Sequence, residues 1–467
     1  MRLVYLVLLV TLLITYGSAL WRILKYSSGL SPLLGWWVGL GYFLICPLTM
    51  ITIAGGFEMP GAYDVGSSWR AVELRSGSFF LPYFLIWLCF QAACLVIYLF
   101  GPSRSSDRHS APVFSIANLE RAILTTMGLT VLDWLIMIKL LGGLDAFIVS
   151  HWYERGEDLV SRLGDSFVLL EHLSMANQVV FTSAAALYMW LGLSKRPVKK
   201  KILVVTLLFL VLEMVMTGNR IYLATYLMAF LVSCFIWRRK RLLVALFVAS
   251  PVLVLVFSAW AAVRHDLTQI PDSLNNYVEA DFGNRTSSAL FDITEGMDLL
   301  LLMHVIRDFG SKYDYLYGAS YSRSVLSFIP RSIYPEKPET FTGSLAELYL
   351  PNILTSLNAT AIGEMYANFG AATLLLFPFS TWCVIWISNW AIGRDGIHFL
   401  GSPILFSLMV WTARSTFEDS FVLFLLALCL IYIFRLERKT RSRQHDRFSR
   451  IAARQEKLLP GTTPLPS

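Results

Sequence analysis

Residues 202–237 read ILVVTLLFLVLEMVMTGNRIYLATYLMAFLVSCFIW. As one straight helix this stretch would be about 54 Å long, well beyond the ~30 Å hydrocarbon core of a membrane. The tetrapeptide Thr217-Gly218-Asn219-Arg220 interrupts the apolar run near its middle. We therefore expect two short membrane-spanning helices, with Arg220 recessed into the membrane face where they join.

Apolar runs of this kind recur along the chain. Of its 467 residues, 56% are hydrophobic and only 15% are charged, whereas soluble domains are about 45–50% apolar and about 25% charged. The sequence therefore predicts an all-α polytopic membrane protein with about eleven transmembrane helices. The predicted spans are 3–21, 33–55, 79–100, 122–143, 174–193, 202–217, 221–237, 242–263, 371–392, 398–413 and 418–434.

Lysine and arginine residues indicate the orientation of these spans. They gather after the first span, between spans three and four, five and six, and seven and eight, and in the carboxyl-terminal tail. Short cytoplasmic connections carry such an excess, so we expect the amino terminus outside and the carboxyl terminus inside. The same bias explains the net charge of +7, and we infer no nucleic-acid partner.

The first span has two interpretations. Gly17-Ser18-Ala19 resembles the cleavage site of a signal peptide. Arg22 and Lys25 after the span outweigh Arg2 before it, which favours a retained helix with its amino terminus outside.

Four regions follow from this layout. Residues 1–263 hold eight helices and the outer loop 144–173, and residues 264–370 form a large outer loop with helical character over 287–307. Residues 371–434 hold the last three helices, and 435–467 form a basic tail that we expect to be disordered. The inner connections are short and lack the G-x-x-x-x-G-K-[S/T] and G-x-G-x-x-G motifs. The sequence therefore favours neither ATP-driven transport by this chain alone nor a cytosolic sugar-nucleotide enzyme.

Cations on the predicted outer side oppose the positive-inside bias and need an explanation. They are Arg220, Arg264, Arg285, Arg323, Arg331, Lys337 and Arg414. Arginine binds phosphate through a planar fork of donors, so we expect a bound anion such as a diphosphate. Pairing with acids or snorkelling to the interface is the alternative. No D-x-D pair or histidine cluster predicts a metal, and we expect no cofactor.

Three residues are candidates for a general base, namely Glu295, Glu364 and His304. Other acids near the spans, such as Asp298, serve equally well as partners for an arginine. Glu364 and Asp419 lie at predicted helix ends, where helix capping is a competing role. Asp133 and Glu213 lie inside predicted spans and indicate helix packing or a polar cavity.

The order of several short motifs resembles a known family. Thr217-Gly218-Asn219-Arg220 is followed by Arg264 and Arg323, then by Phe328-Ile329-Pro330 and Tyr334-Pro335-Glu336-Lys337-Pro338. The series ends with Thr360-Ala361-Ile362-Gly363-Glu364, with Thr412-Ala413-Arg414 and with Phe417-Glu418-Asp419-Ser420. This pattern resembles the Wzy-type oligosaccharide repeat-unit polymerases, which include O-antigen and enterobacterial common antigen polymerases.

The resemblance implies a membrane-embedded glycosyltransferase of GT-C-like fold in the bacterial inner membrane. It implies that undecaprenyl-diphosphate-linked oligosaccharides are polymerised on the periplasmic face, with a chain-length regulator and a flippase as partners. Arg220, Arg264, Arg323 and Arg414 match positions that would hold the diphosphates, and Lys337 matches a basic position. We treat Arg285, Arg331 and Asp419 as supporting residues. The alternatives are an O-antigen ligase-like glycosyltransferase, a polysaccharide flippase or other transporter, and a structural membrane subunit.

Overall fold

A computed structural model describes most of the chain. The described residues are 1–26, 30–58, 71–75, 77–102, 116–152, 165–219, 221–245, 248, 296–326, 329, 333–350, 357–393 and 401–433. Helices account for nearly all regular structure in these residues, and the described strands form one antiparallel pair, β1 (Gly56–Glu58) with β2 (Ala71–Glu73). The coarse prediction of an all-α protein is confirmed.

The amino-terminal third forms long apolar helices. In chain order they are α1 (Arg2–Tyr26), then α2 (Pro32–Leu40), η1 (Gly41–Ile45) and α3 (Cys46–Ala54), then α4 (Phe80–Phe100). Ser31 caps α2 by accepting a hydrogen bond from the Leu34 backbone N–H, and Pro32 occupies the first turn, where a missing N–H costs nothing. The following π-helical turn joins α2 to α3 without a break, so 32–54 acts as one long element.

The middle of the chain contains α5 (Ile116–Leu141), α6 (Leu144–Trp152), α8 (Asp165–Leu193), α9 (Lys200–Thr217) and α10 (Ile221–Ile236). The predicted break in 202–237 is confirmed, because α9 ends at Thr217 and α10 starts at Ile221. Gly218 makes this end possible: its φ of 67° is left-handed, and its N–H bonds to the Met214 carbonyl.

The carboxyl-terminal part has shorter helices followed by apolar ones. They are α14 (Gly296–Asp308), α15 (Ala319–Leu326), α16 (Phe341–Tyr349), α17 (Thr360–Phe369), η4 (Gly370–Ala372), α18 (Thr373–Gly393), α19 (Gly401–Arg414) and α20 (Phe417–Ile433). The run Leu299–Met303 of α14 is at most 1% exposed, and α14 contacts α3, η1 and α4. The prediction that this short apolar helix packs on the membrane helices is confirmed.

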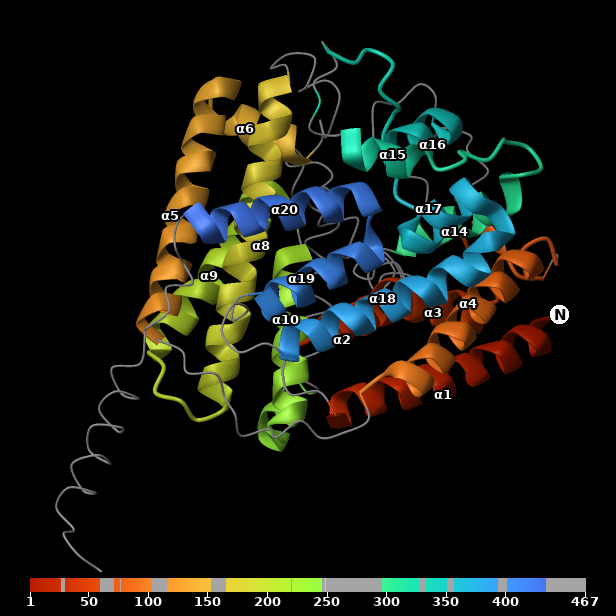
Figure 1. The fold of residues 1–467 in the computed structure, drawn as a ribbon, viewed down its shortest axis with the longest axis horizontal. Coiled ribbons are helices and arrows are strands. Elements are labelled where there is room, and N and C mark those ends of the chain that lie inside the picture. Colours follow the sequence, from red (N-terminus) through yellow and green to blue (C-terminus); the bar gives the residue numbers. More distant parts are fainter. Residues whose placement is uncertain are drawn as a thin grey trace, which may run out of the picture.

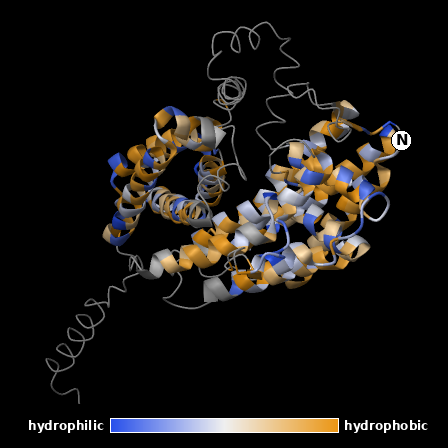
Figure 2. Ribbon diagram, turned by 90° about the horizontal axis from the view of Figure 1, so that it is seen from above, coloured by the Kyte–Doolittle hydropathy of each residue, from blue (hydrophilic) through white to orange (hydrophobic). Residues whose placement is uncertain are grey.

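Several helices have the length and composition of membrane spans. Among the described residues five qualify, over Arg2–Tyr26, Pro32–Ala54, Phe80–Phe100, Ile116–Leu141 and Thr360–Asn389. Large apolar side chains face outward on these helices, for example Leu3 (75% exposed) and Leu375 (76%), and Figure 2 shows hydrophobic residues along most of the ribbon. Such surfaces are stable against lipid and costly in water, which identifies a membrane protein. Every predicted span except 242–263, which lies mainly outside the described residues, overlaps a helix.

The helices run in two main directions (Figure 1). Helices α5, α8 and α10 run up the view, while α1, α2, α4, α18 and α19 run across it. Helix α8 connects the sets, because it contacts α5 and α10 on one side and α19 and α20 on the other. The short helices α14–α17 lie at one end of the second set.

The packing of α2 on α19 depends on glycine. A Cβ at Gly35 would clash with the backbone carbonyl of Phe406, and one at Gly39 would lie 2.8 Å from the Cβ of Ala413. The spacing G-x-x-x-G is typical of helices whose backbones approach closely in membranes. This contact holds α19, and therefore Arg414 at its end, against the amino-terminal helices.

Gly35→Ala tests this contact. The backbone of Phe406 cannot move aside like a flexible side chain, so we expect destabilisation of about 1–3 kcal/mol. Gly128→Ala is the matched control, since a Cβ there meets nothing within 4 Å; it should leave stability unchanged or raise it by up to about 1 kcal/mol. Thermal unfolding in detergent, followed by tryptophan fluorescence, measures both, and equal melting temperatures would contradict the packing argument.

Candidate functional site

Helices α14, α15, α17, α19 and α20 meet at one place, which we call the junction. It consists of Asp298, Ser320, Asn358, Thr360, Glu364, Asn368 and Arg414 with the backbone of Phe417. Five of the predicted site residues, His304, Arg323, Glu364, Arg414 and Asp419, lie on its helices. Arg220, Arg264, Arg285, Arg331 and Glu295 lie outside the described residues.

The Glu364 carboxylate ties three helices together. It lies within α17 and is 1% exposed. Its Oε1 accepts a hydrogen bond from the Ser320 hydroxyl of α15 at 2.8 Å, and its Oε2 accepts one from the Phe417 backbone N–H at 2.7 Å. Phe417 is the first residue of α20, whose free N–H groups and dipole favour a negative charge. The competing capping role considered for Glu364 is therefore present, although the capped helix is α20.

Asn368 supports this contact from one turn further along α17. Its Nδ2 donates to Ser320 Oγ at 2.8 Å, and its Oδ1 accepts from the Gly318 backbone N–H at 3.0 Å. Asn368 is itself 1% exposed. The start of α15 is thus held by side-chain hydrogen bonds in a buried setting, where leaving a donor unpaired costs about 1–3 kcal/mol.

Arg414 joins the junction at the end of α19. Its Nε lies 3.4 Å from Asp298 Oδ2 in the first turn of α14, with about a fifth of the arginine side chain exposed. Its backbone carbonyl accepts a hydrogen bond from Asn358 Nδ2 at 2.8 Å. Pairing with an acid, which was the alternative to anion binding for these cations, is therefore present at Arg414. Nε is one of several guanidinium donors, so the pairing with Asp298 orients the group toward one side of the junction.

Arg323 lies on the same face of α15 as Ser320, because the two residues are three apart on a helix. It is half-buried. Since Ser320 bonds to Glu364 and α15 contacts α20, Arg323 belongs to the edge of the junction. Asp419 lies in the first turn of α20.

Thr360, the first residue of α17, has an unusual backbone conformation. Its φ is 63°, in the left-handed region that a β-branched residue rarely adopts. The residue is fully buried, and its hydroxyl Oγ1 has no hydrogen-bond partner. Its N–H bonds to Asn358 Oδ1 at 3.3 Å, which links this turn to the end of α19. Strain of this kind costs about 1–3 kcal/mol and persists only where the surroundings impose it.

His304 and Lys337 lie away from the junction contacts. His304 is fully buried; its Nδ1 is 2.9 Å from the Leu300 carbonyl, and its ring packs on Phe79 at 5.0 Å. Lys337 is 7% exposed and donates to the Ile329 carbonyl at 3.1 Å. In this arrangement His304 packs α14 and Lys337 fixes the proline-rich segment.

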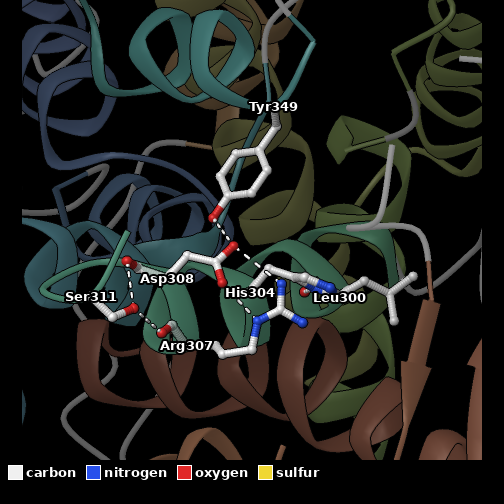
Figure 3. Close-up of polar contacts among 6 residues, drawn as sticks. All are labelled: Leu300, His304, Arg307, Asp308, Ser311 and Tyr349. Carbon is white, nitrogen blue, oxygen red and sulfur yellow. Dashed lines mark hydrogen bonds and ion pairs between the residues drawn. The ribbon is translucent and has the colours of Figure 1, made fainter. Parts of the chain in front are cut away.

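A separate polar group lies at the carboxyl-terminal end of α14 (Figure 3). Arg307 Nε bonds to Asp308 Oδ1 at 2.7 Å, and the Tyr349 hydroxyl donates to Asp308 Oδ2 at 3.2 Å. The Arg307 guanidinium also lies 5.1 Å from the centre of the Phe79 ring. Burial, and then the Asp308 charge, raise the pKa of Tyr349, so its hydroxyl stays protonated as a donor. This group attaches α16 to α14.

Sequence reasoning missed Ser320, Asn358 and Asn368. Each is a small polar residue in a loop or short helix, and its partner is far away in sequence. Glu364 and Asn368 are four residues apart, which places both on one face of α17. This spacing is the sequence signal that would have predicted a shared site for the two side chains.

In the described part of the chain, no group of three or more histidine, cysteine, aspartate or glutamate side chains is arranged to hold a metal. No family model, curated protein or solved structure matches the chain.

Substitution of Glu364 separates its positioning role from general-base chemistry. Glu364→Ala leaves the Ser320 hydroxyl and the Phe417 N–H without partners, so we expect a loss of about 2–5 kcal/mol in the free energy of unfolding. Glu364→Gln keeps one acceptor oxygen and should lose about half as much. Thermal unfolding of the purified variants measures this order.

If the chain has the glycosyltransferase activity that the sequence resemblance implies, the glycan product made by the Glu364→Gln variant supplies the second readout. A positioning residue predicts reduced product in proportion to the loss of stability. A variant as stable as wild type that makes no polymer would contradict that role and identify Glu364 as the base.

Proposed function

We propose that this chain is a membrane-embedded glycosyltransferase of the oligosaccharide repeat-unit polymerase type. It transfers a growing glycan from undecaprenyl diphosphate onto a new lipid-linked repeat unit at the periplasmic face of a bacterial inner membrane. A chain-length regulator and a flippase are its expected partners.

The observation that carries this proposal is that Arg323 and Arg414 lie on helices that meet at the junction. The two arginines are 91 positions apart in sequence, yet α15 and α19 both contact α17 and α20. A diphosphate needs several cations around it. The junction lies where the helices of the segment 264–370 meet the last apolar helices, so a lipid-borne diphosphate would reach it from the membrane.

The proposed chemistry needs no nucleotide. The acceptor hydroxyl oxygen attacks the anomeric carbon of the growing glycan, a glycosidic bond forms, and the bond from that carbon to the diphosphate oxygen breaks. Arginines stabilise the negative charge that develops on the leaving undecaprenyl diphosphate. The acceptor proton passes to a general base. Glu364 and His304 are engaged in packing contacts, so the proposal assigns the base to Glu295, which directly precedes α14 in sequence.

We also infer about eleven spans in a GT-C-like arrangement. The basic connections predict that the amino terminus lies outside and the carboxyl terminus inside. Fusion of a reporter that fluoresces only in the cytoplasm tests this layout. A fusion at Ser467 should fluoresce, and a fusion after Gly143 in the outer loop should not. Fluorescence of both fusions would contradict the layout.

A product ladder tests the function itself. In a host lacking the gene, wild type should restore a ladder of glycan lengths, whereas Arg323→Met and Arg414→Met should yield single repeats at equal expression. Each loss should reach tenfold or more, since a charge-assisted phosphate contact contributes about 1.5–3 kcal/mol. Arg241→Met, on the opposite predicted side and exposed, is the control and should behave as wild type.

Two other products would contradict the proposal. Lipid-linked polymer accumulating outside, without surface glycan, would identify a ligase that transfers finished chains. Single lipid-linked units retained inside the cell would identify a flippase.

A further inference from the structure

A second polar site lies inside the helices α5, α8 and α9, away from the junction. Phe209 of α9 packs between Trp134 of α5 and Phe181 of α8, with ring centres 5.5 and 5.2 Å apart. Glu213 lies one helical turn beyond Phe209, Asp133 lies beside Trp134, and Asn177 and Gln178 lie one turn before Phe181. Packing therefore places these four polar side chains on three neighbouring helices, close to the contact between Trp134, Phe209 and Phe181.

The hydrogen bonds of this group fix the orientation of its amides. Asn177 Nδ2 donates to the Thr126 carbonyl at 3.0 Å and to Thr130 Oγ1 at 2.9 Å, and Gln178 Nε2 donates to Thr130 Oγ1 at 3.0 Å. The Thr130 hydroxyl gives its own proton to the Thr126 carbonyl, so it can only accept from the two amides. Both amide nitrogens are thus used, and both amide oxygens point elsewhere.

The oxygens left over have no hydrogen-bond partner, and the two amide oxygens among them can only accept. Asp133 Oδ1, Asn177 Oδ1, Gln178 Oε1 and Glu213 Oε2 are all buried without a hydrogen-bond partner. Gln178 is 1% exposed, Glu213 3% and Asn177 5%. The other Asp133 oxygen accepts from the Ser174 hydroxyl at 2.6 Å. Buried acceptors without donors are costly, so a positively charged ligand would complete the group.

The charges lead to the same requirement. Asp133 acts electrostatically on the Glu213 carboxyl, and in the described part of the chain neither is within ion-pair distance of a lysine, arginine or histidine. Two neighbouring buried carboxyl groups cannot both stay ionised without a compensating positive charge, so the group takes up either a proton or a cation. The Trp134 indole N–H also lacks a partner, but one neutral donor cannot balance two carboxylates.

We propose that Asp133, Asn177, Gln178 and Glu213 bind a hard metal cation, of the Na⁺ or Ca²⁺ class, within the helices α5, α8 and α9. Carboxylate and amide oxygens are the ligands that hard cations prefer. A proton shared between the two carboxyls would satisfy only two oxygens, whereas a metal ion is coordinated by several. This inference does not depend on the proposed glycosyltransferase activity.

The experiment uses the full-length protein in lipid nanodiscs, freed of metal with EDTA. Its melting temperature is measured at constant pH and ionic strength in choline chloride, and with NaCl, CaCl₂ or MgCl₂ replacing part of the choline. We expect a saturable rise of ~3 °C or more with one of these ions, and the effective ion distinguishes a monovalent from a divalent site. Glu213→Gln and Gln178→Met should abolish the rise, whereas the exposed control Asp145→Asn should keep it.

Binding of radioactive ²²Na⁺ or ⁴⁵Ca²⁺ to the same samples gives a second readout. This measurement remains valid for a variant of low stability, because size exclusion isolates the folded protein and the bound ion is counted per folded molecule. A wild-type protein whose melting temperature responds to none of the metals, and which binds neither isotope, would overturn the proposal. So would stabilisation by acid alone that disappears in Glu213→Gln, since the site would then hold a proton.

Discussion

The arrangement of helices α15, α17 and α20 depends on the hydrogen bonds of the buried Glu364 carboxylate. It accepts hydrogen bonds from Ser320 on α15 and from the first backbone N–H of α20, while its own helix continues into α18. A charge in this setting is stable only when its oxygens are bonded. The donors of α15 and α20 are buried by the same contact, so they in turn need the Glu364 oxygens as acceptors.

The positions of Arg414 in the junction and of Arg323 at its edge follow from this constraint. Ser320 fixes α15 and thereby Arg323 one turn away. The short connection from Arg414 to Phe417 holds the end of α19 beside the start of α20, and Asn358 bonds to the Arg414 carbonyl. The glycines of α2 allow α19 to approach closely on its other side. A diphosphate site built in this way would be set before its ligand arrives, which lowers the cost of binding.

Local patterns predicted most helices and few of the contacts between them. The break after Thr217 and the packing of Leu299–Met303 were readable, because helix length, glycine conformation and apolar runs are local properties. The bond from Glu364 to Phe417 joins residues 53 positions apart, and no local pattern specifies such a pair.

The central claim is that the junction binds a lipid diphosphate through Arg323 and Arg414. Native mass spectrometry of the purified protein with undecaprenyl diphosphate measures this binding directly, with phosphatidylglycerol as the competing anionic lipid. Wild type should bind the diphosphate selectively, and the double variant Arg323→Met/Arg414→Met should lose that selectivity while still binding phosphatidylglycerol. Equal diphosphate binding by wild type and the folded double variant would contradict the account.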